Sequence, residues 1–136
     1  MNDIIINKIQ SIQRCVKRAK DEYENAGNGF DSDYTRQDAA ILNVIRACEQ
    51  TIDLANHLIK IKKIGIPNSS SESFEILVKN SIIPLNLGDS LKEMVGFRNK
   101  VTHEYQRIDS SLVKNVIKKD MNDLLLFTEK ILDDNE

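Results

Sequence analysis

Apolar residues recur every three or four positions along this chain, and this spacing restricts the fold more than any other sequence feature. Near the N-terminus the steps are four, three, four, three and four, at Ile5, Ile9, Ile12, Val16, Ala19 and Tyr23. Because an α-helix turns by about 100° per residue, residues spaced in this way form one stripe that faces a partner helix. The stripe predicts a first helix from about Asp3 to Asn25.

The same spacing predicts four further helices. Gly27-Asn28-Gly29 breaks the first helix, and the loop that begins at Gly65 contains a proline and a serine run. The second predicted helix reaches Lys63 and has Thr35 as its candidate N-cap, and a third, shorter helix starts at Ser71. The fourth runs from about Leu85 to Glu104 and the last from about Ser110 to Asp133. Two of them carry long core stripes, at Ile41, Val44/Ile45, Cys48, Ile52, Ala55 and Ile59, and at Val113, Ile117, Met121, Leu124, Thr128 and Ile131.

No alternating strand pattern interrupts these helices, so the predicted fold class is all-α. Short connections between long helices favour an up-and-down antiparallel bundle of four to five helices. A chain of 136 residues is long enough for one domain with its own core, spanning residues 1–136. The net charge of -2 excludes an overall basic coat for nucleic acid, although a local site can differ in sign.

The remaining composition predicts a cytoplasmic protein with no membrane partner. No apolar run approaches about 18 residues, and the N-terminus lacks the apolar core of a signal peptide. Cys15 and Cys48 fit no CxxC or metal-binding spacing and lie at apolar helical positions, so we expect buried free thiols. Glu49 and Asp53, one helical turn apart, could bind a metal or support a site, but a solvated face is the preferred interpretation.

The stretch Phe97-Arg98-Asn99-Lys100-Val101-Thr102-His103-Glu104-Tyr105 gathers polar groups on one arc of the fourth predicted helix. With Arg98 at zero, Asn99 lies near about 100°, His103 near about 140° and Tyr105 near about -20°. The apolar residues of this stretch fall on the opposite arc. Gly96 precedes it, and because glycine costs roughly 1 kcal/mol inside a helix, we expect close packing there against another helix or another subunit.

Arginine and histidine together suit the chemistry of a phosphodiester. The Arg98 side chain offers a planar fork of donors to phosphate oxygens and is always charged. His103 can take or give a proton near neutral pH. Asn99, about one turn before His103, could orient the imidazole or a phosphate oxygen. These three residues are the candidate catalytic and supporting groups, and no metal or cofactor site is predicted.

Four residues separate Arg98 from His103, and one residue separates His103 from Tyr105. This spacing resembles the R-x4-H-x-Y motif of HepT toxins in the HEPN superfamily. Gly96-Phe97-Arg98-Asn99 resembles the entrance to that motif, and Gln37-Asp38-Ala39-Ala40-Ile41-Leu42-Asn43 resembles the start of the family's second helix. The helical layout agrees over nearly all 136 residues. The sequence departs mildly from the family pattern at Lys100-Val101-Thr102. These residues are more polar than those that usually occupy the interior of the motif, and they place a cation beside the site.

The resemblance implies a homodimer in which two motif helices face each other across a composite cleft. It implies a metal-independent endoribonuclease, with tRNA as the expected target, that serves as the toxin of a type VII toxin–antitoxin system. A small MntA-like nucleotidyltransferase antitoxin would attach AMP to the motif tyrosine, which is Tyr105 here, and so block the site.

For the reaction we expect attack by the RNA 2′-hydroxyl, with His103 transferring protons and Arg98 stabilising the phosphorane. One subunit offers one motif histidine, whereas a symmetric dimer offers two, enough for an acid and a base. The alternative hypothesis is a non-catalytic helical dimer that binds and assists a partner nucleotidyltransferase. A nucleotide-sensing bundle is a weaker third hypothesis, because the chain has no Gly-rich phosphate loop.

Overall fold

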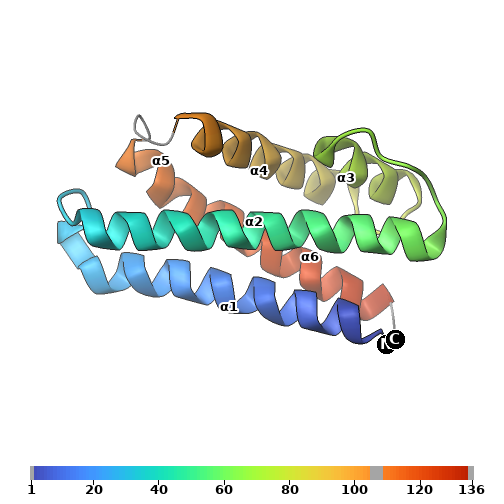
Figure 1. The fold of residues 1–136 in the computed structure, drawn as a ribbon, viewed down its shortest axis with the longest axis horizontal. Helices are drawn as coiled ribbons and strands as arrows, with labels where there is room; N and C mark the ends of the chain where they lie inside the picture. The colour runs from blue at the N-terminus through green and yellow to red at the C-terminus, as the bar shows by residue number, and fades with distance from the viewer. Residues whose placement is uncertain (1, 105–108, 135–136) are drawn as a thin grey trace.

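Long helices that alternate in direction make up the computed structural model, which describes residues 2–104 and 109–134 (Figure 1). Their bounds are α1 Asp3–Ala26, α2 Tyr34–Lys62, α3 Ser70–Lys79, α4 Leu85–Glu104, α5 Ser110–Asn115 and α6 Met121–Asp134. In Figure 1, α1, α2, α4 and the α5–α6 segment run up and down in turn, and the short α3 lies beside α4. The described residues contain no strand, so the prediction of an all-α antiparallel bundle is confirmed.

The predicted stripes form the core. The stripe residues of α2 from Ile41 to Ile59 are buried, apart from the half-buried Ile45, and all six predicted positions from Val113 to Ile131 are buried. Five residues of π-helix, Val116–Asp120, join α5 to α6. A π-turn is wider than an α-turn, so it keeps the consecutive steps of four from Val113 to Met121 pointing at the core.

Two helix starts differ from their predicted positions because another side chain provides the cap. The Asp33 carboxylate accepts the backbone N–H of Arg36 at 3.1 Å, so α2 begins at Tyr34 and the prediction of Thr35 as its cap is wrong. The Ser69 hydroxyl accepts the N–H of Glu72 at 3.1 Å, so α3 begins one residue before Ser71. The predicted bounds of α4 agree with the structure.

Both cysteines are buried and free, as predicted. Within residues 2–104 and 109–134, no helix is long and apolar enough to cross a membrane. The first turn of α1 and the last turn of α6 lie at the same end of the bundle, and the C-terminal half of α4 lies at the opposite end (Figure 1).

Candidate active site on α4

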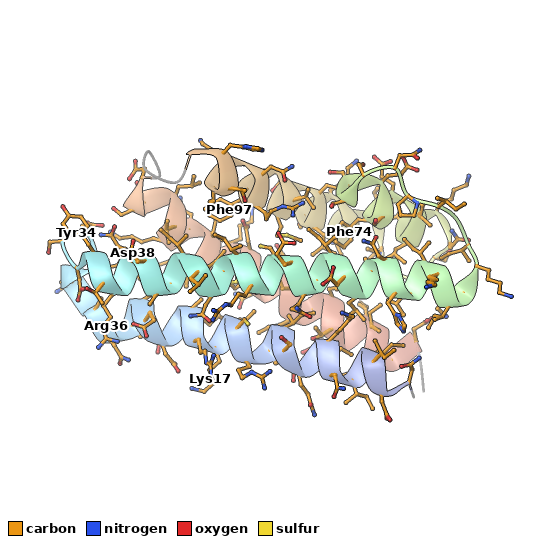
Figure 2. All side chains as sticks on the ribbon, viewed as in Figure 1. Lys17, Tyr34, Arg36, Asp38, Phe74 and Phe97 are labelled. Carbon is orange, nitrogen blue, oxygen red and sulfur yellow. The ribbon has the colours of Figure 1, made fainter. Side chains whose placement is uncertain are left out.

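The second half of α4 separates apolar and polar side chains onto opposite faces, as its sequence predicts. Met94, Phe97 and Val101 are buried, and Phe97 lies on the side of α4 that faces the bundle interior (Figure 2). Asn99, Lys100 and His103 are exposed. The apolar face therefore fixes the rotation of α4 and turns the polar residues outward.

Arg98 is held at a junction of three helices. Its Nη1 atom donates to Oε1 of Glu49 on α2 at 2.6 Å, and its Nη2 atom donates to Oγ of Ser70 at the start of α3 at 3.3 Å. The Arg98 side chain is 20% exposed, and its Nε atom is buried without a hydrogen-bond partner. Arg98 therefore presents its charge from a fixed position at the edge of the polar face.

His103 and Asn99 stand further around the helix and project into solvent. His103 lies five positions after Arg98, so their side chains leave the α4 axis about 140° apart. No side-chain hydrogen bond joins Asn99 to His103 within the part of the chain that the structure describes. The hydroxyl of Thr102 donates to the backbone carbonyl of Arg98 at 2.8 Å and so remains close to its own helix.

Gly96 lies on the same exposed stripe as Asn99 and His103, at positions i, i+3 and i+7. A Cβ atom placed on Gly96 would meet no heavy atom within 4 Å. The expectation that another helix of this chain packs closely on Gly96 is therefore wrong. The expectation that another subunit packs there stays a prediction.

Glu49 and Asp53 have separate partners instead of forming a common ligand pair. Asp53 lies 3.9 Å from the ammonium of Lys8 on α1, whereas Glu49 is bound to Arg98. Both side chains are about half exposed, at 44% for Glu49 and 52% for Asp53, as the preferred solvated face requires, and Glu49 in addition forms an ion pair with Arg98. No group of three or more histidine, cysteine, aspartate or glutamate side chains suited to a metal occurs among the described residues.

Cys48, whose thiol is buried, immediately precedes Glu49 in the sequence. Burial, with a smaller contribution from the negative charge of Glu49, raises the pKa of Cys48 to about 12, and the positive charge of Arg98 acts in the opposite direction. The thiol is therefore neutral near pH 7 and is a packing group, not a nucleophile. Tyr105, the candidate modification site, lies outside the described residues.

Comparisons with known proteins place these features in a family. The family model described as ribonuclease HepT-like matches residues 7–131. The mRNA nuclease HepT of Shewanella oneidensis is 45% identical over 131 residues, which cover 96% of this chain and 98% of that protein.

Two solved structures also have the same fold. One contains the tri-AMPylated HEPN toxin of Shewanella oneidensis in complex with MNT antitoxin, with a TM-score of 0.89, 44% identity and coverage of 96% of this chain and 98% of that chain. Another, a toxin–antitoxin with AMP-PNP, has a TM-score of 0.88 at 44% identity and covers 96% of this chain and 99% of that chain.

Proposed function

The chain belongs to the HepT-like ribonuclease family, and from this premise we propose that it cleaves RNA as the toxin of a type VII toxin–antitoxin pair. The observation that carries the proposal is the intact pair Arg98 and His103, which α4 presents on one polar face of a fold shared with a HEPN toxin. A protein that only docked a partner would have no chemical need for both groups. We propose further that residues 1–136 act as one domain in the cytoplasm.

The reaction that fits these groups is transesterification at an RNA phosphodiester. The 2′-oxygen bonds to phosphorus while the bond from phosphorus to the 5′-oxygen breaks, which leaves a cyclic phosphate end. His103 takes the 2′-proton or gives a proton to the departing oxygen. Arg98 binds the phosphate and stabilises the extra negative charge of the phosphorane. Side chains supply both roles, so the proposed reaction needs no metal ion.

A homodimer completes this site. One chain offers one motif histidine, and Arg98 and His103 diverge by about 140° around α4. A second α4 packed on the stripe of Gly96, Asn99 and His103 would bring two histidines to one cleft. Gly96 supports this arrangement, because a residue without a side chain allows two helix axes to approach closely.

A leucine at Gly96 should separate the dimer without unfolding the chain. Gly96 is exposed and a Cβ atom there meets no heavy atom within 4 Å, so we expect the protomer to accommodate the Gly96→Leu side chain. In the dimer it would stand between two helices, and we expect at least about tenfold weaker association, which corresponds to about 1.4 kcal/mol. Sedimentation equilibrium measures this, with Gly96→Ala as the milder control. Unchanged dimerisation of Gly96→Leu would show that the stripe is not the interface.

The proposed partners follow from the related complexes. An MntA-like nucleotidyltransferase antitoxin would transfer AMP to Tyr105, as the tri-AMPylated toxin in complex with MNT antitoxin suggests. The similar Shewanella protein is named an mRNA nuclease, whereas the motif resemblance led us to expect tRNA. Sequencing of the RNA ends produced by this protein from total RNA distinguishes these two targets.

Growth of bacteria that express the chain alone tests the proposed function. Expression of the unmodified protein should arrest growth, and His103→Ala at equal expression should relieve the arrest. Coexpression of the nucleotidyltransferase should also restore growth. Equal arrest by the wild type and by His103→Ala would reject a ribonuclease that acts through His103, and no arrest by either protein would favour the non-catalytic, partner-binding dimer.

A further inference from the structure

We propose that Glu49 is a positioning residue for catalysis, which fixes the Arg98 guanidinium with the help of Ser70. This inference rests on the proposed function, because it concerns how the same site is held ready. It adds a carboxylate from α2 and a hydroxyl from α3 to a motif that otherwise lies entirely on α4.

The contacts define which donors remain for a substrate. A guanidinium has five N–H groups. Glu49 accepts one from Nη1, Ser70 accepts one from Nη2, and the Nε group is buried. One N–H on each Nη atom is left, and these two can reach phosphate oxygens. Without Glu49 and Ser70 the long arginine side chain would be free to turn its fork in several directions.

The negative charge of Glu49 has a further consequence. It offsets part of the Arg98 charge before RNA binds, so the pair attracts a ground-state phosphate less strongly than a bare arginine would. The phosphorane carries one more negative charge than the phosphodiester, so a correctly aimed Arg98 acts mainly in the transition state. Loss of Glu49 should therefore lower kcat without raising KM.

Asp53 provides a matched control on the same helix. It lies one turn after Glu49, carries the same charge and is 52% exposed, against 44% for Glu49. Its partner is Lys8 on α1, at 3.9 Å, and it has no contact with Arg98. Removal of either carboxylate changes the net charge equally, so any difference between the two variants comes from the contact with Arg98.

The kinetic test compares Glu49→Ala, Glu49→Gln and Asp53→Ala as intact dimers. We expect Glu49→Ala to lower kcat by about 10- to 100-fold, since misplacement of a catalytic group by about 1 Å has effects of this size. Glu49→Gln should regain part of the loss, because its amide oxygen can still accept from Nη1, and Asp53→Ala should behave as the wild type. In an Arg98→Ala background, Glu49→Ala should cause no further loss. A raised kcat, a raised KM alone, or additive losses would overturn the proposal.

A second readout does not depend on cleavage. The Arg98 Nε–H resonance in ¹⁵N-labelled protein should report a rigid side chain in the wild type and in Asp53→Ala, and faster motion in Glu49→Ala and, to a smaller degree, in Glu49→Gln. Equal rigidity in all four proteins would overturn the proposal even if the protein proved inactive on RNA. Conversely, an inactive wild type with a Glu49-dependent Arg98 would reject the proposed function and the catalytic role of Glu49, and would leave standing only the positioning of Arg98 by Glu49.

Discussion

Replacement of Arg98 by lysine is expected to lower kcat/KM for RNA cleavage by about 10²–10³-fold, although the positive charge is kept. The guanidinium satisfies Glu49 and Ser70 at once and still has donors for a phosphate. A lysine ammonium is a single point with three donors, so Arg98→Lys cannot reach all of these groups in the same geometry. Single-turnover cleavage of a labelled RNA measures the loss.

The matched control is Arg36→Lys. Arg36 also forms an ion pair between helices, from Nη1 to Glu22 at 2.8 Å, but it lies in the first turn of α2 and outside the motif. This variant should cleave RNA at the wild-type rate. Activity of Arg98→Lys within about threefold of the wild type would mean that charge alone suffices, and the role of the planar fork would be rejected.

Protein that carries AMP on Tyr105 is expected to show no detectable cleavage. The attached group adds bulk and negative charge two residues from His103, so RNA is excluded by steric overlap and by repulsion. Purified protein would be incubated with the nucleotidyltransferase and ATP, and intact-mass and peptide mass spectrometry would locate the modification before cleavage is assayed.

The variant Tyr105→Phe should remain active after the same treatment, because it lacks the phenolic oxygen that receives AMP. Tyr34 supplies the control, since it is 72% exposed in the first turn of α2 and offers an accessible phenol outside the motif. Tyr34→Phe should be modified and silenced like the wild type. Inactivation of Tyr105→Phe by the partner enzyme would place the modification on another residue.

Local spacing was sufficient to predict most of the fold. The extents of α1 and α4 and the buried stripes follow from a period near 3.6 residues, which depends on nothing beyond each helix. The starts of α2 and α3 were less accurate, because serine, threonine and aspartate are all good caps and several of them are adjacent at both places. The backbone then decides which one accepts the hydrogen bond.

The candidate site likewise has one part that the sequence predicts and another part that it does not. Arg98, Asn99 and His103 belong to one helix, so their common polar arc could be read from the sequence. The contact from Arg98 to Glu49 joins residues 49 positions apart, and the contact to Ser70 depends on how α3 packs beside α4. The spacing of residues within one helix does not predict such contacts between helices. The sequence therefore indicated the solvent exposure of Glu49 but not its ion pair with Arg98.

Cleavage of RNA by the unmodified protein in excess EDTA, with His103→Ala in parallel, tests the central claim most directly. Mass spectrometry would first confirm that Tyr105 is bare and sedimentation that both proteins are dimers. The account predicts cleavage that ends in a cyclic phosphate, and a rate about 10²–10⁴-fold lower for His103→Ala. No cleavage by the folded wild-type dimer, or equal cleavage by both proteins, would contradict a metal-independent ribonuclease that acts through His103.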